Sequence, residues 1–193
     1  MMRVLGSVTR TVKHMEYRHT QRVDVAGGVY IFDCSLMAQW ALERGAPVAA
    51  RSIAGRLGRR PLAADYQRHF ALLSPQRERG GWRRVERLQD AQPGDVIAWL
   101  KPKIIDSPNT RHVAFVVLPP TRVRGYSDAY LVRIADATRL AHDDDTRRGG
   151  SGFGFGTILL VIDPDTGAPR AYGWVALRWR AFETAIAIAR PTR

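Results

Sequence analysis

The sequence predicts an α+β domain in which a largely helical N-terminal half packs on a C-terminal antiparallel sheet. Three observations support this fold class. Before residue 75 apolar residues recur at helical spacing, and after Pro93-Gly94 the chain changes to short β-rich runs separated by turn residues. The length of 193 residues, 45% of them hydrophobic, suits one packed core. We therefore expect a single domain over residues 1–193, with helices first and the sheet second.

The first expected helix begins at Cys34 and runs to Glu43. Its apolar residues recur at helical spacing, and Gly45-Ala46-Pro47 ends the pattern. Further helices are expected over residues 49–57 and 62–73. Residues 1–16 carry only a short apolar patch, so we expect them to form an N-terminal extension.

The second half contains six expected strands, and turn residues separate them. The stretch "PPTRVRGYSDAY" predicts a long hairpin, and residues 142–193 are expected to add strands to the sheet. The glycine-rich "GGSGFGFG" is interpreted as a flexible loop and "HDDDTR" as a solvated loop, so no metal site is expected. The expected strands cover residues 95–100, 112–118, 130–135, 157–162, 171–176 and 184–189.

The chain is strongly basic, with 30 Lys and Arg against 18 Asp and Glu and a formal charge of +12. A positive surface favours anionic partners such as nucleic acid or an anionic cell-wall polymer. The arginines are scattered along the whole chain, which fits a generally basic surface as well as a dedicated polyanion site. No apolar run approaches the roughly 18 residues that a membrane span needs, so we expect no span.

Cys34 is the only cysteine, and its place before a helix makes it a candidate nucleophile. Unpaired N–H groups at a helix N-terminus stabilise a thiolate, and a neighbouring histidine increases its reactivity. His112 opens the strand-like run "HVAFVV", and Asp136 stands near the end of the next long run, where it can orient an imidazole. The alternative is that Cys34 is a small buried apolar side chain.

Four short motifs occur in an order that resembles the NlpC/P60 superfamily of papain-like cysteine peptidases. They are "FDCS", "LQDAQPGDVIAW", "RHVAFVV" and "IADAT", and the resemblance covers roughly residues 17–140. It implies a papain-like fold and a triad of Cys34, His112 and Asp136. Leu36 stands where the family has glycine, and an aspartate is less common than histidine as the third triad residue.

The resemblance also implies a substrate-binding group. Asp33 and Ser35 match family positions that help to bind a free amine of the substrate peptide, although both residues are also typical of helix caps. Tyr17 matches a family tyrosine that faces the active site. The backbone N–H of Cys34 is the natural first donor of an oxyanion hole.

The expected function is that of a monomeric cysteine hydrolase, without a cofactor, that cleaves amide bonds in peptidoglycan stem peptides or muropeptides. The alternatives are an acyltransferase or thioesterase with the same Cys–His machinery, and a non-catalytic basic domain that binds wall polymer or nucleic acid. A wall substrate implies the cell envelope or periplasm if a signal segment was removed. Otherwise the protein is expected in the cytoplasm.

Overall fold

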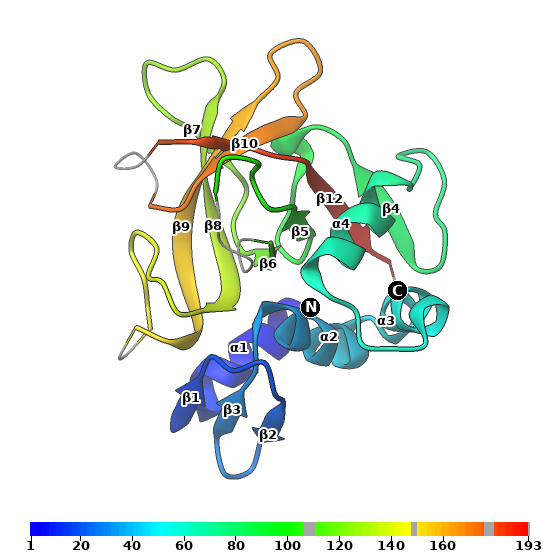
Figure 1. The fold of residues 1–193 in the computed structure, drawn as a ribbon, viewed down its shortest axis with the longest axis vertical. Helices are drawn as coiled ribbons and strands as arrows, with labels where there is room; N and C mark the ends of the chain where they lie inside the picture. The colour runs from blue at the N-terminus through cyan, green and yellow to red at the C-terminus, as the bar shows by residue number, and fades with distance from the viewer. Residues whose placement is uncertain (106–110, 148–149, 176–179, 193) are drawn as a thin grey trace.

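The computed structural model describes residues 1–105, 111–147, 150–175 and 180–192, and it has the expected α+β character, with 24% helix and 33% strand. A large sheet occupies one side of the molecule, and helices α2 to α4 lie against it (Figure 1). Its strand order is β11-β10-β9-β8-β6-β5-β12-β4, with β7 paired to β8. All described pairings within this sheet are antiparallel.

Each of the six strands expected from the sequence overlaps a strand of the large sheet. In chain order these strands are β5, β6, β8, β9, β10 and β12. The expected hairpin is present, because Thr121–Arg122 pairs with Tyr130 and Leu131. Two short strands of this sheet were not predicted, β4 and β11. The expected strand over 171–176 ends at Gly173, and Ala176 lies outside the described residues. The bounds are β4 Trp82–Val85, β5 Val96–Trp99, β6 His112–Val116, β7 Thr121–Arg122, β8 Ala129–Thr138, β9 Gly152–Ile162, β10 Pro169–Gly173, β11 Phe182–Glu183 and β12 Ile186–Pro191.

The interpretation of "GGSGFGFG" as a flexible loop is wrong for residues 152–156. These residues form the first half of β9, and they pair residue by residue with the last half of β8. Alternating glycines leave room above a strand, which the sequence pattern alone does not distinguish from loop flexibility. Here the space above Gly154 and Gly156 is filled by Arg147 and His142.

The three predicted helices are present as α2 Cys34–Gly45, α3 Pro47–Leu57 and α4 Ala63–Ala71. Pro47 occupies the first turn of α3, where its missing N–H costs no hydrogen bond, and Gly58 ends that helix in a left-handed conformation. Helix α2 packs against β6 and β8, and α4 packs against β5, β6 and β12.

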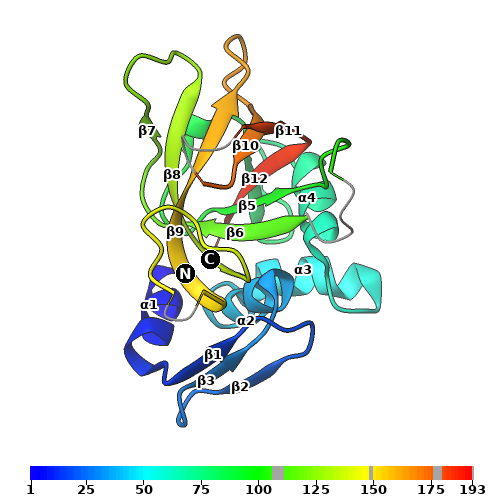
Figure 2. The ribbon, with the colours of Figure 1, turned by 60° about the vertical axis from the view of Figure 1, so that its left-hand side comes forward.

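Residues 1–16 do more than extend the domain. Residues Met2–Thr11 form helix α1, whose Leu5 and Val8 are completely buried, and α1 packs on α2. Three short strands, β1 His14–Glu16, β2 Arg22–Asp24 and β3 Val29–Ile31, form a separate sheet below α2 (Figures 1 and 2). The N-terminal segment therefore belongs to the core of the fold.

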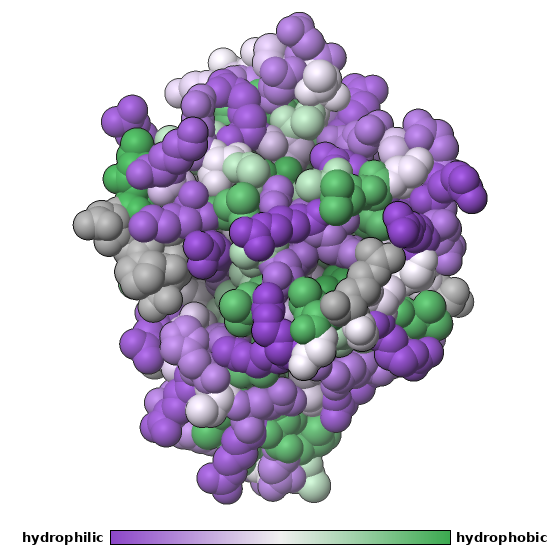
Figure 3. Space-filling model, turned by 45° about the vertical axis from the view of Figure 1, so that its right-hand side comes forward, coloured by the Kyte–Doolittle hydropathy of each residue, from purple (hydrophilic) through white to green (hydrophobic). Residues whose placement is uncertain are grey.

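The large sheet separates two apolar clusters. Val113 and Phe115 of β6 contact the cluster that contains α2, whereas Ala114 and Val116 belong to the cluster on the other face. This alternation follows from the pleat of a strand buried on both faces. The exterior is largely hydrophilic, with scattered apolar patches on the face drawn in Figure 3. Among the described residues no helix is both long and apolar enough to cross a membrane.

Candidate active site

Cys34 lies at the first turn of α2, where Asp33 caps the helix. The Asp33 carboxylate accepts hydrogen bonds from Leu36 N–H at 2.8 Å and from the Ser35 hydroxyl at 2.8 Å. Cys34 itself is only 5% exposed and contacts the apolar cluster around α2. The cap fixes the start of α2, so Cys34 stands at the N-terminal end of this helix.

Asp33 has two further partners, His19 Nδ1 at 3.0 Å and Arg60 Nη1 at 3.3 Å, both on the second carboxylate oxygen. Burial opposes ionisation of this carboxyl group, but the hydrogen bonds from Leu36, His19 and Ser35 hold its pKa below the ordinary value. Asp33 is therefore an ionised helix cap, which was one of its two predicted roles.

Tyr17 lies near Cys34. Burial raises the pKa of the Tyr17 phenol, and the nearby Cys34 and Asp33 raise it further. The phenol therefore stays protonated across the physiological range and can act as a hydrogen-bond donor. Arg139 stacks on the same ring, with its guanidinium carbon 5.5 Å from the ring centroid.

His112 and Asp136 are joined by a hydrogen bond of 2.6 Å between Nε2 and Oδ2. His112 starts β6, and Asp136 stands in β8 with no exposed surface. Because an ionised carboxylate only accepts hydrogen bonds, the proton on this ring lies at Nε2 and Nδ1 is left as the proton acceptor. This tautomer is the one that a general base needs.

Asp136 also holds two side chains that the sequence analysis did not select. His142 Nε2 lies 2.9 Å from Oδ2, and Arg147 Nη2 donates to Oδ1. Arg147 also donates to the carboxylate of Asp145 and to the carbonyl of Gly152. The segment that was interpreted as a solvated acidic loop therefore sends His142 and Arg147 inward to Asp136, and that interpretation is wrong for these two residues.

His142 lies between Asp136 and the backbone of Trp174. Its Nδ1 is 3.1 Å from the carbonyl oxygen of Trp174. Its Nε2 is 2.9 Å from Oδ2 of Asp136. Burial lowers the pKa of His142 to about 4, and the hydrogen bond to Trp174 only partly offsets this.

A cavity of about 550 Å³ opens beside His112. Tyr17 and His112 line it, whereas Cys34, Asp33, Ser35 and Asp136 are not among its lining residues. No hydrogen bond between Cys34 and His112 occurs among the contacts of the described residues, and the pairing of nucleophile and base stays a prediction. In the described part of the chain, no group of three His, Cys, Asp or Glu side chains could hold a metal ion.

The chain matches no protein-family model, no curated protein and no solved structure. The resemblance to NlpC/P60 peptidases therefore depends on the four sequence motifs alone.

Proposed function

We propose that this protein is a cysteine hydrolase that cleaves amide bonds. In this proposal Cys34 is the nucleophile, His112 is the general base and acid, and Asp136 positions His112. The observation that carries the proposal is the 2.6 Å hydrogen bond from His112 Nε2 to a fully buried carboxylate, next to a cavity that His112 lines. A general base that serves a cysteine nucleophile needs its histidine held in this way.

The proposed reaction has two steps. His112 Nδ1 takes the thiol proton while Sγ of Cys34 attacks the carbonyl carbon, and the C–N bond then breaks as His112 returns the proton to the leaving amine. A water molecule, deprotonated by His112, hydrolyses the thioester and restores the free thiol. Asp136 stabilises the imidazolium that forms in each step.

The resemblance suggests peptide stems of the bacterial cell wall as the substrate. An acyltransferase or thioesterase would use the same thioester and would differ only in the molecule that resolves it. Incubation with purified muropeptides, followed by mass spectrometry of the products, tests both the bond cleaved and the acceptor. Hydrolysis adds the mass of one water across the broken bond.

Labelling with iodoacetamide at neutral pH tests the nucleophile separately from the substrate. We expect wild-type Cys34 to react rapidly and His112→Gln to react more slowly, since the base is lost. His14→Gln is the matched control, because His14 is an exposed histidine on β1. Equal labelling rates in all three proteins, together with intact muropeptides, would indicate a non-catalytic binding domain.

A further inference from the structure

The cavity beside His112 has a cationic rim. Arg111, next to His112 in the chain, and Arg139, which follows β8, both line it and are exposed. Neither guanidinium forms an ion pair with a carboxylate in the described part of the chain, and no described lining residue is acidic. Two arginines that line one cavity, with no carboxylate partner among the described residues, attract an anion and repel an amine.

The walls of the cavity are aromatic. Tyr17, Tyr172, Trp174 and Phe182 all line it. The rings of Tyr172 and Phe182 contact each other at a tilt, with centroids 6.1 Å apart, and the centroids of the Trp174 and His112 rings are 5.1 Å apart. Rings fixed in this way favour an apolar or aromatic group of a ligand, while the arginines bind its charged end.

The carboxylate that the sequence resemblance assigned to amine binding is already occupied. Asp33 accepts from Ser35 and Leu36 on one oxygen and from His19 and Arg60 on the other. An incoming ammonium group would have to displace these donors and approach beside Arg60. The structure therefore disfavours recognition of a free amine at Asp33.

We propose that the cavity binds a peptide or N-acyl amino acid with an apolar or aromatic side chain and a free carboxylate, held by Arg111 and Arg139. This inference depends on the proposed function for its placement near the reacting groups, and it specifies the charge of the substrate. The carboxylate lies at the arginine rim, and the apolar side chain lies among Tyr172, Trp174 and Phe182.

Binding of two matched probes tests this proposal without any turnover. N-acetylphenylalanine carries the carboxylate, and N-acetylphenylalaninamide differs only by having a neutral amide in its place. Titration calorimetry on the Cys34→Ala protein, with intrinsic tryptophan fluorescence as a second signal, measures both affinities. We expect the acid to bind at least about fivefold more tightly than the amide, with a difference that shrinks at high ionic strength, as for a partly exposed ion pair.

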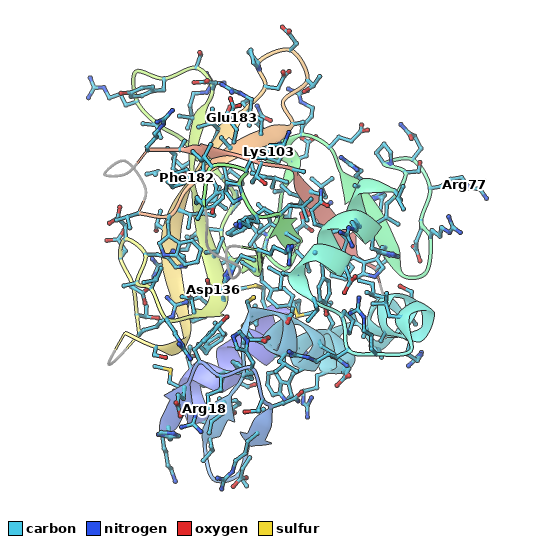
Figure 4. The ribbon with its side chains drawn as sticks, in the orientation of Figure 1. Arg18, Arg77, Lys103, Asp136, Phe182 and Glu183 are labelled. Atoms are coloured by element: carbon cyan, nitrogen blue, oxygen red, sulfur yellow. The ribbon has the colours of Figure 1, made fainter. Side chains whose placement is uncertain are left out.

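Variants identify the residues responsible. Arg111→Gln and Arg139→Gln should each weaken binding of the acid by roughly threefold to tenfold and leave the amide unchanged. Arg77→Gln is the matched control, because Figure 4 shows Arg77 pointing outward at the edge of the molecule, away from Asp136. The same loss of affinity in Arg77→Gln would assign the effect to the overall basic charge and overturn the proposal.

Three other results would also overturn it: equal affinity for acid and amide, tighter binding of the cationic probe phenylalaninamide, or no binding of the acid up to its solubility limit. These results are independent of whether Cys34 is a nucleophile, which the labelling rates measure. A reactive Cys34 with no preference for the acid would refute only the ligand assignment. A preference for the acid with an inert Cys34 would refute only the hydrolase.

Discussion

Acidification should destabilise the protein through His142, and the effect can be isolated with one variant. The side chain of His142 has no exposed surface, and burial lowers its pKa from 6.5 to about 4. The unfolded chain then takes up a proton near pH 6.5, whereas the folded protein does so only near pH 4. The contribution of His142 to stability is complete above pH 6.5 and is lost as the pH falls from 6.5 to 4.

The size of the effect follows from these two pKa values. One pKa unit corresponds to about 1.4 kcal/mol, so the complete loss below pH 4 is about 3 kcal/mol. At pH 5 the unfolded chain is largely protonated at His142 and the folded protein is not. The loss of stability between pH 7.5 and pH 5 is therefore about 2 kcal/mol.

Urea unfolding followed by tryptophan fluorescence at pH 7.5 and pH 5 measures this loss. We expect the free energy of unfolding of wild type to fall by about 2 kcal/mol more than that of His142→Gln, which cannot titrate at this position. His14→Gln, at an exposed site, should behave as wild type. The reasoning would be refuted if acidification lowered the free energy of unfolding less in wild type than in His142→Gln. That result would mean that the folded state binds the proton on His142 more tightly than the unfolded chain does.

Three further predictions concern the site and its support. Cys34→Ala should abolish muropeptide cleavage while circular dichroism and thermal unfolding stay close to wild type; retained cleavage would exclude Cys34 as the nucleophile. Asp136→Asn should slow cleavage by about tenfold to a thousandfold and should also destabilise the fold, because it removes one of the two carboxylates that pair with the buried Arg147. Urea unfolding should show that adding Arg147→Met recovers part of this stability but not the rate, and a full recovery of the rate would remove Asp136 from the mechanism. Leu5→Ala should cost about 2–5 kcal/mol in the same assay, as expected for a buried leucine, and a cost near zero would show that α1 is not part of the core.

The sequence predicted the elements whose signals are local. A helix starting at Cys34 follows from the capping residue Asp33 and from the apolar spacing after it, and both are read within a few residues. The hydrogen bond between His112 and Asp136 could also be predicted, because each residue stands near the end of a run with strand character. Helix α1 was missed because it lacks a side-chain N-cap and its buried residues are few.

The contacts of His142 and Arg147 with Asp136 could not be predicted from the sequence, because neither residue carries a local signal of burial. Next to three aspartates, His142 looks solvated, and Arg147 is one of many scattered arginines. Their burial depends on the glycines of β9: a Cβ atom at Gly154 would lie 2.4 Å from Cγ of Arg147, and one at Gly156 would lie 2.4 Å from Cβ of His142.

The alternation of glycine and phenylalanine in β9 therefore has two functions in the fold. Phe153 packs into the apolar cluster that contains α2, while the glycines on the other face leave the space in which Arg147 and His142 reach Asp136. Asp136 pairs with Gly154 across the two strands, so the carboxylate and the space beside it are set by the same register. A one-residue shift of β9 would place phenylalanine side chains where Arg147 and His142 now lie. The register between β8 and β9 thus determines whether the carboxylate that orients His112 can be buried with its charge compensated.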